Sequence, residues 1–93
     1  MKALIEYGWS ILGIGFTEQE AWEDAQKNLP DELKAYHCED LDDFECITDP
    51  QITENFYFVD VPEKVDTYIW DNGYEGAYSY WQKLEEEAET WWL

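Results

Sequence analysis

Four side chains near the middle of the chain are of types that bind zinc. His37, Cys38 and Cys46 could supply three ligands, with Asp40 as a fourth. Structural zinc sites usually take closely spaced pairs of cysteines or histidines, and this sequence has neither a Cys-x-x-Cys pair nor a second histidine. We therefore expect no zinc site and two free thiols packed in or near the core.

The acidic residues in the same region invite comparison with a calcium-binding loop. They are Asp40, Asp42, Asp43 and Glu45. Counted from Asp40, however, the sixth position is Glu45, where the loop needs glycine, and the twelfth is Gln51, where it needs glutamate. The sequence therefore predicts no metal ion and no other cofactor, although weak binding of divalent ions by so acidic a segment stays open.

Residues that could catalyse a reaction are few. Gly13-Ile14-Gly15 precedes a predicted helix like a phosphate-binding loop, but Glu18 stands where that loop would need a third glycine. Cys38 lies next to His37 in sequence, which does not by itself bring a nucleophile and a base together in space. Carboxylates are so numerous that no acid and base pair stands out. We therefore predict that the protein is not an enzyme.

Charge is the feature that departs most from an ordinary small protein. The chain has 23 acidic residues against five basic ones, all of them lysines, and a formal net charge of −18. Such a field repels nucleic acids and anionic membranes, so we expect no direct binding to either. The sequence has no convincing export signal, no apolar run long enough to span a bilayer and too few cysteines for a disulfide framework. A cytoplasmic location is expected.

The glutamates near the C-terminus suggest that the acidity serves a partner. Glu85, Glu86, Glu87 and Glu89 lie toward the C-terminal end of a predicted helix, where the helix dipole disfavours negative charge. Glu85 and Glu89 also form a like-charge pair four residues apart. Carboxylates on one helix face lie about 5–6 Å apart at Cβ, a spacing comparable to that of successive phosphates. A rigid acidic helix could therefore occupy a groove built for DNA or RNA.

The residues that we expect to contact the partner are acidic, with one aromatic exception. They are Glu18, Glu23, Asp40, Asp42, Asp43, Glu85, Glu86, Glu89 and Trp92. Trp91 and Trp92 are adjacent, so a helix cannot point both into one core, and an exposed tryptophan is a good anchor for a protein partner or a homodimer. Tyr36 and Tyr80 are further candidates of this kind.

The first third of the chain has clear structural signals. Aromatic and β-branched residues with interspersed glycines predict a long bent strand or a hairpin over residues 2–16. Thr17 and Glu20 match a capping box, and apolar residues at helical spacing continue until Pro30. The pattern predicts a helix over about residues 18–29.

The rest of the chain alternates between weaker and stronger patterns. Residues 31–43 are polar and predict a loop with one helical turn near Leu33. Three further strands are predicted, at Phe44–Thr48, Asn55–Val61 and Thr67–Trp70. A turn signal at residues 71–73 precedes an apolar stripe, from Tyr74 to Trp91, that is typical of a helix. The order predicts one α+β domain over residues 1–93, with an antiparallel sheet of three to five strands and two main helices packed on one face.

The segment from Gly13 to Ala25, GIGFTEQEAWEDA, resembles the strand-to-helix joint of HicB-like antitoxin domains. The resemblance covers 13 of the 93 residues and implies a similar local fold. No functional residue is carried over from it.

Three functions fit the composition. The first is an inhibitor that mimics nucleic acid and occupies the basic DNA- or RNA-binding surface of a host nuclease or defence complex. Phage-encoded anti-CRISPR and anti-restriction proteins are similar in being small and strongly acidic. The second is an antitoxin-like or adaptor module that neutralises a basic partner, mainly through aromatic contacts. The third is adaptation to high salt, with no partner.

Overall fold

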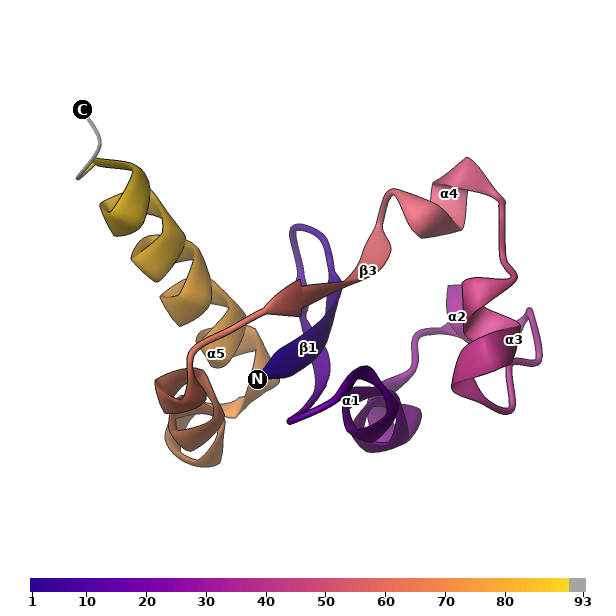
Figure 1. The fold of residues 1–93 in the computed structure, drawn as a ribbon, viewed down its shortest axis with the longest axis horizontal. Coiled ribbons are helices and arrows are strands. Elements are labelled where there is room, and N and C mark those ends of the chain that lie inside the picture. The colour runs from indigo at the N-terminus through magenta and orange to yellow at the C-terminus, as the bar shows by residue number, and fades with distance from the viewer. Residues whose placement is uncertain (91–93) are drawn as a thin grey trace.

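The fold combines a small sheet with helices on both of its sides (Figure 1). The computed structural model describes residues 1–90, with side chains up to Glu87. Its elements are β1 (Lys2–Glu6), β2 (Ser10–Gly15), α1 (Glu18–Ala25), a 3₁₀ turn η1 (Gln26–Asn28), α2 (Asp31–Lys34), α3 (Leu41–Glu45), α4 (Pro50–Thr53), β3 (Phe56–Asp60) and α5 (Glu63–Thr90). The strands form one antiparallel sheet in the order β2-β1-β3. The predicted α+β class, with two main helices, is confirmed.

Residues 2–16 form a hairpin, one of the two alternatives that the sequence allowed. Gly8 in the turn has a φ of 82°, which glycine adopts without strain. The register shifts between Leu4 and Ile5, so that Leu12 is an extra residue in β2. The outer edge of β2 is closed by side chains rather than by another strand, because the Ile14 N–H donates to Asp24 and the Leu12 carbonyl accepts from Asn28.

The predicted first helix and its cap are confirmed. The Thr17 hydroxyl accepts from the Glu20 N–H at 3.1 Å, and the Glu20 carboxylate accepts from the Phe16 N–H. Helix α1 lies directly on β2, and a Cβ at Gly13 would overlap backbone atoms of Ala21 and Ala25. Glycine in β2 therefore allows the helix to approach the sheet closely.

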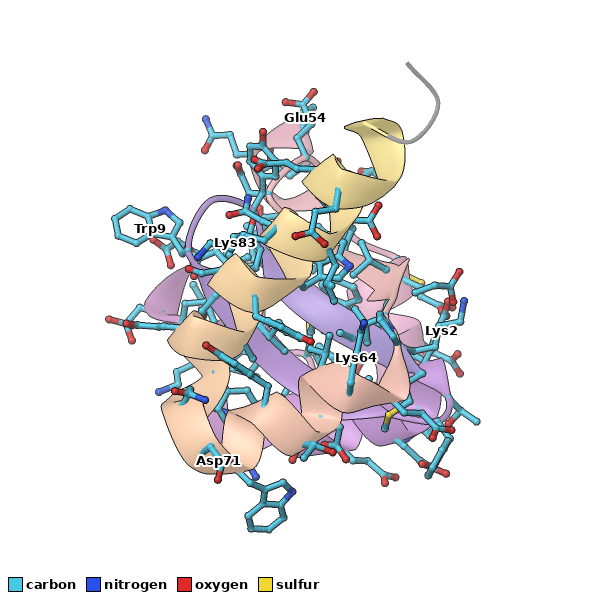
Figure 2. The ribbon with its side chains drawn as sticks, turned by 90° about the vertical axis from the view of Figure 1, so that its left-hand side faces the viewer. Lys2, Trp9, Glu54, Lys64, Asp71 and Lys83 are labelled. Atoms are coloured by element: carbon cyan, nitrogen blue, oxygen red, sulfur yellow. The ribbon has the colours of Figure 1, made fainter. Side chains whose placement is uncertain are left out.

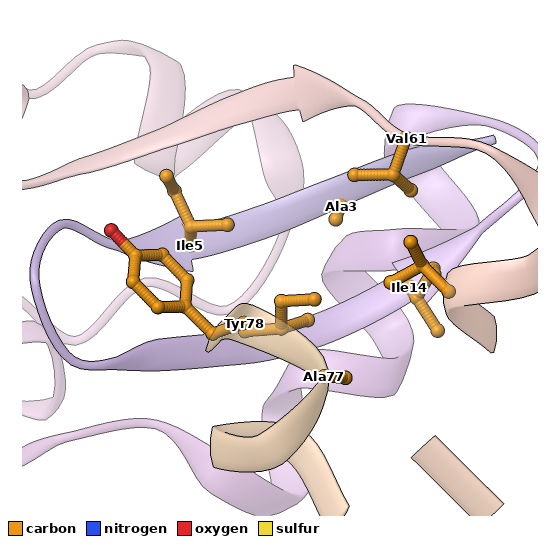
Figure 3. Close-up of a cluster of buried hydrophobic side chains, with 8 residues drawn as sticks. Ala3, Ile5, Ile14, Val61, Ala77 and Tyr78 are labelled. Atoms are coloured by element: carbon orange, nitrogen blue, oxygen red, sulfur yellow. The ribbon is translucent and has the colours of Figure 1, made fainter. Parts of the chain in front are cut away.

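We expected helices on one face of the sheet, but the structure has helices on both faces. Alternate residues of β1 point to opposite faces, and each set packs against different helices. On one side Ala3 and Ile5 pack with α5 residues such as Ala77 and Tyr78 (Figure 3). On the other side Leu4 packs with Trp22 of α1. The short helices α2, α3 and α4 add Leu33, Phe44 and Ile52 to this second cluster. Both faces of the sheet are thus buried.

Two predicted strands are wrong. Phe44 belongs to α3, where its ring lies 5.1 Å from that of Trp22, and Thr67–Trp70 belongs to the first part of α5. Phe44 is buried on α3, whereas Trp70 on α5 is 85% exposed. The strand predicted at Asn55–Val61 is confirmed as β3.

Helix α5 consists of two segments that meet at Gly73, which has non-helical backbone angles of 77° and 176°. Figure 2 shows the resulting change of direction. The predicted turn signal at residues 71–73 therefore marks a break between two helical segments. Tyr68 and Tyr80 stack across this break with ring centroids 4.4 Å apart and rings inclined by 6°.

Within residues 1–90, no helix combines the length and the apolar character needed to cross a bilayer.

Candidate functional site

The structure divides the acidic residues that were predicted to bind a partner between two layers. Glu18 and Glu23 lie on α1, and the group from Asp40 to Asp43 lies at α3, on the same side of the sheet. Glu85 and Glu86 lie on α5, which covers the opposite side. The acidic residues on α1 and α3 therefore do not share a face of the molecule with those on α5.

Two of the carboxylates in the first layer have a structural role. Asp40 is the N-cap of α3 and accepts a hydrogen bond from the Asp43 N–H at 2.9 Å. Asp43 in turn accepts from the Glu39 N–H at 3.2 Å. Such reciprocal bonds satisfy backbone donors at the start of a helix. The position of these two acids is explained by local folding without any partner.

The other predicted acids of this layer are less constrained. Glu23 is exposed and accepts a hydrogen bond from Gln19. Asp42 is exposed, and Glu18 is half-buried. These three carboxylates are available at the surface of α1 and α3.

In the second layer, Glu85 and Glu86 border a cavity of about 200 Å³ that is lined mainly by aromatic rings. The other lining residues are Tyr7, Tyr57, Tyr78, Trp81 and Gln82. Tyr78 is buried, Tyr57 and Trp81 are half-buried, and Tyr7, Gln82 and both glutamates are exposed. Three of the rings therefore form the more buried part of the lining, and the carboxylates belong to its exposed part. The side chain of Glu89 and all of Trp92 lie outside the described residues.

Three elements meet at this cavity. Tyr7 comes from the hairpin turn, Tyr57 from β3 and the remaining residues from α5. Tyr78 fixes the turn to the helix, because its hydroxyl accepts from the Gly8 N–H at 2.8 Å and from Gln82 at 3.1 Å. The rings of Tyr78 and Trp81 are 5.9 Å apart between centroids. Side chains distant in sequence are therefore held together by tertiary contacts.

Tyr57 stays neutral at this site. Burial raises the pKa of its phenol above the ordinary value, with smaller contributions from Tyr78 and Tyr7. Glu85 and Glu86 are the two acidic side chains that line the cavity. Trp81 Nε1 is buried and has no hydrogen-bond partner within the described part of the chain.

None of the five lysines lines this cavity. A second cavity, of about 310 Å³ and between α1 and α5, does contain a lysine. There Lys27 Nζ lies 2.9 Å from Asp24 Oδ1 and 5.6 Å from the centroid of the Tyr74 ring. The Asp24 hydrogen bond raises the pKa of Lys27, with further contributions from Tyr74. In this cavity the chain thus supplies its own cation.

The residues considered for zinc do not form a metal site within the described chain, where no three His, Cys, Asp or Glu side chains are placed to hold an ion. Cys38 and Cys46 are free, the first half-buried and the second exposed. Burial raises the pKa of the Cys38 thiol, and Asp43 and Asp40 raise it further. A raised pKa disfavours the reactive thiolate.

Sequence reasoning missed the aromatic residues of the site. Tyr7, which lines the cavity, and Trp9, which does not, flank Gly8 in the hairpin turn and are 59% and 73% exposed. Figure 2 shows Trp9 projecting from the body of the protein. Aromatic residues beside a turn glycine were the available signal. Of the two tyrosines that were named, Tyr36 donates a hydrogen bond to Asp49 at 2.6 Å and Tyr80 stacks on Tyr68.

Comparisons with known proteins found no relative of this chain. No family model matches the chain, and no curated protein or solved structure matches it. The resemblance to the HicB-like joint therefore stays a local one, and the function has to be argued from the chain itself.

Proposed function

We propose that this protein is a non-enzymatic inhibitor that mimics nucleic acid and occupies the basic DNA- or RNA-binding surface of a cytoplasmic host nuclease or defence complex. It would bind in place of the nucleic acid and so prevent the complex from acting. The observation that carries the proposal is the large negative charge that the fold leaves without internal neutralisation.

Ion pairs account for little of this charge. Among the described residues, Lys2 pairs with Asp60 at 2.7 Å and Lys27 with Asp24 at 2.9 Å. Five lysines cannot neutralise 23 acidic residues, whichever ion pairs they form. The net charge of −18 is therefore available to steer a basic partner toward the protein, with an attraction that salt weakens.

Glu85 and Glu86 are the best placed of the acids for this role. They are exposed on α5 and do not cap a helix, in contrast to Asp40 and Asp43. Their place toward the C-terminal end of the helix is unfavourable for helix stability. A partner would give a reason for glutamates at a place that the helix dipole disfavours.

The test is a competition experiment with a captured partner. The immobilised protein is incubated at low salt with nuclease-treated lysates of candidate hosts, and the proteins retained are identified and purified. Each is then assayed for binding with and without saturating duplex DNA or RNA. Mimicry predicts that nucleic acid prevents binding, and equal binding of the loaded and the free partner would show that mimicry is wrong.

A matched pair of variants makes this test more specific. Glu85→Gln/Glu86→Gln removes two charges at the proposed contact, and Glu54→Gln/Glu75→Gln removes two exposed charges elsewhere. We expect the first double variant to weaken binding by about tenfold, the sum of two charge contacts of ordinary strength. The second should change affinity by about twofold through the long-range field.

A second candidate function is an antitoxin-like or adaptor module that neutralises a basic partner. The aromatic cavity and the exposed Trp9 favour it, because tyrosine and tryptophan dominate the energetics of many protein interfaces. For this function, alanine at Trp9 or Trp92 should reduce affinity more than charge reversal at Glu85 and Glu86. The opposite ranking favours nucleic-acid mimicry.

A further inference from the structure

We propose that the outer edge of β3 binds an extended basic segment of the partner as a fourth, antiparallel strand, with a lysine or arginine side chain beside Glu6 and Glu32. This inference rests on the proposed function in one respect, namely that the partner presents a basic surface. It adds the part of the fold that makes the contact and the conformation that the bound segment takes.

The backbone of β3 directs alternate hydrogen-bonding groups away from the sheet. The Val61 N–H donates to the Met1 carbonyl at 2.9 Å, and the Tyr7 N–H donates to the Asn55 carbonyl at 2.7 Å. In this register the odd-numbered residues face β1, so the backbone groups of the residues between them point outward. The outward set is Phe56, Phe58 and Asp60, and within the described chain no loop or side chain accepts a hydrogen bond from their N–H groups.

The two edges of the sheet differ in this respect. At the outer edge of β2 the Ile14 N–H donates to Asp24, and the Leu12 carbonyl accepts from Asn28. β3 forms the opposite edge (Figure 3). It lacks three features that commonly prevent strand addition, because it contains no lysine, no proline and no bulge in its register with β1. The edge of β3 is therefore the one that can accept a further strand.

The side chains of β3 leave apolar surface for such a strand to cover. Residues 57–59 are half-buried, whereas residues 3–5 of β1, with which they pair, have no exposed surface. The difference arises because β1 has a strand on each side and β3 has one on a single side. Aromatic and β-branched residues on neighbouring strands stabilise a sheet by packing across the pair. An added strand would cover residues 57–59 as β3 covers β1.

The end of this edge near Phe56 is acidic. Glu6 pairs with Phe56 in the sheet, and a third cavity, of about 220 Å³, has Glu6, Glu32 and Phe56 in its lining. Burial raises the pKa of Glu6, and the nearby charge of Glu32 raises it further, as expected for two carboxylates that repel each other. A positive side chain placed here would relieve that repulsion.

The charges along β3 give the direction of the bound strand. The far end of β3 already has positive groups, because Lys2 pairs with Asp60 at 2.7 Å and the N-terminal ammonium donates to the Val61 carbonyl at 3.0 Å. The basic residues of the partner therefore belong at the Phe56 end, which the C-terminal end of an antiparallel strand reaches. Trp9 also lines the third cavity, and its exposed ring offers a face to a cation.

A second copy of the chain suits this edge less well than a basic segment does. Pairing β3 with itself would bring together two chains that each have a formal net charge of −18, and like charges of this size oppose association. The same field attracts a segment rich in lysine and arginine. Charge therefore selects the occupant, and the backbone of β3 selects its extended conformation.

The experiment follows the binding of four peptides to the full chain by two-dimensional NMR. The probe is acetyl-Thr-Val-Thr-Val-Thr-Lys-Arg-amide, in which five residues can pair with β3 and two basic residues extend past Phe56. Its counterparts have the reversed sequence, glutamate in place of both basic residues, or proline at the three central positions. We expect saturable shifts with the probe, an affinity about threefold lower for the reversed peptide, and no saturable shifts with the other two.

Amide hydrogen exchange gives the readout that is specific to strand pairing. When the probe is saturating, the N–H groups of Phe56, Phe58 and Asp60 should exchange at least about tenfold more slowly than in the free chain. Those of Tyr57 and Val59 face β1 and should change by less than about twofold. A peptide held by charge alone would not produce this alternation.

One pair of variants tests the backbone contact. Asp60→Pro removes an outward N–H and places a ring in the path of the added strand, whereas Asp60→Asn keeps the N–H. Both variants lose the ion pair with Lys2, so their comparison isolates the backbone effect. We expect the affinity for the probe to fall by about fivefold or more in Asp60→Pro and by less than about twofold in Asp60→Asn.

A second pair tests the charges. Glu6→Gln/Glu32→Gln should weaken binding of the probe by about fivefold, whereas Asp71→Asn/Glu75→Gln, which removes two exposed charges on α5, should change it by less than about twofold. The spectrum of each unliganded variant shows whether the fold is retained. The exchange pattern of the parent chain tests the proposal independently of every variant.

Several results would overturn the proposal. Among them are no saturable shifts with the probe, equal affinities for the probe and the proline peptide, uniform slowing of exchange over residues 56–60, and equal losses within either pair of variants. Sedimentation of the free chain as a dimer, with the alternating protection already present, would assign the edge to a second copy instead.

The outcome is separable from that of the nucleic-acid competition. If the probe pairs with β3 but nucleic acid does not prevent binding of the captured partner, mimicry fails and the strand site stands. If nucleic acid competes but the probe does not pair with β3, mimicry stands and the strand site fails.

Discussion

The Tyr74 hydroxyl donates a hydrogen bond of 3.0 Å to Asp24 Oδ2, across 50 residues of sequence. The same carboxylate accepts from the Ile14 N–H at 3.0 Å and pairs with Lys27 at 2.9 Å. Asp24 therefore connects α1, the outer edge of β2 and α5. It is an acidic residue whose place is explained by stability.

Asparagine at Asp24 should destabilise the protein. The substitution removes the charge that Lys27 and Tyr74 bind and replaces a carboxylate oxygen with a donor, so we expect a loss of about 1–3 kcal/mol in the free energy of unfolding. Urea denaturation measures it. Glu23→Gln is the matched control, because Glu23 is next to Asp24 in sequence and its carboxylate accepts only an exposed hydrogen bond from Gln19 among the bonds described. An equal loss of stability in both variants would contradict the role of Asp24.

The stability of the protein at acidic pH should also depend on Asp24. Burial alone would raise its pKa, but hydrogen bonds from Lys27, the Ile14 N–H and Tyr74, together with the Lys27 charge, hold it below the ordinary value of 3.8. A carboxyl whose pKa is lower in the folded state stabilises the protein above its unfolded pKa and loses this contribution as the pH falls through the folded value. Stability should therefore drop below about pH 4 in the parent chain, and less steeply in Asp24→Asn.

Glu6 should change the stability of the protein with pH in the opposite direction to Asp24. Burial, with a smaller contribution from Glu32, raises its pKa, so its protonated form is favoured in the folded state. Its contribution is complete below the unfolded pKa and is lost as the pH rises through the folded pKa. Between neutral pH and about pH 5, Glu6→Gln should consequently flatten the gain in stability that accompanies acidification, as measured by thermal unfolding at a series of pH values.

Two glycines should respond to alanine for different reasons. At Gly13 a Cβ would overlap the backbone of α1, so Gly13→Ala should cost about 3 kcal/mol or more. At Gly73 a Cβ has nothing within 4 Å, but the backbone angles of this residue are strained for any L side chain, at a cost of about 1–3 kcal/mol. Denaturation of the two variants compares them, and a harmless Gly13→Ala would contradict the close contact of α1 with β2.

The dependence of folding on salt concentration distinguishes acidity that serves a partner from acidity that is an adaptation to high salt. The chain buries aromatic and aliphatic residues on both faces of its sheet, so we expect it to be folded in low-salt buffer, with a moderate gain in stability as salt screens its self-repulsion. Circular dichroism across a salt series measures this. Unfolding at low salt and folding only in molar salt would favour the adaptation.

Local patterns in the sequence determined the elements whose signals are contained within a few residues. The capping box at Thr17 and Glu20 and the apolar stripe of the last helix each rest on short-range rules, and both are present in the structure. Over residues 2–16 the pattern indicated extended chain but left a bent strand and a hairpin open, and the structure has the hairpin. The patterns failed at Phe44 and at Thr67–Trp70, because a short run of aromatic and β-branched residues does not distinguish a strand from part of a helix.

Only the tertiary structure decided which acids have structural roles and which border a cavity. The sequence presents Asp24, Asp40 and Glu85 as similar charges. In the fold the first closes a sheet edge and the second caps a helix, while the third lies beside rings from the hairpin turn and β3. These differences arise from contacts between residues far apart in the chain, such as Gly8 and Tyr78, which are 70 positions apart, and no local pattern encodes them. The physical reason is that a cavity is formed by the packing of several elements, whereas a helix or a turn is formed by one.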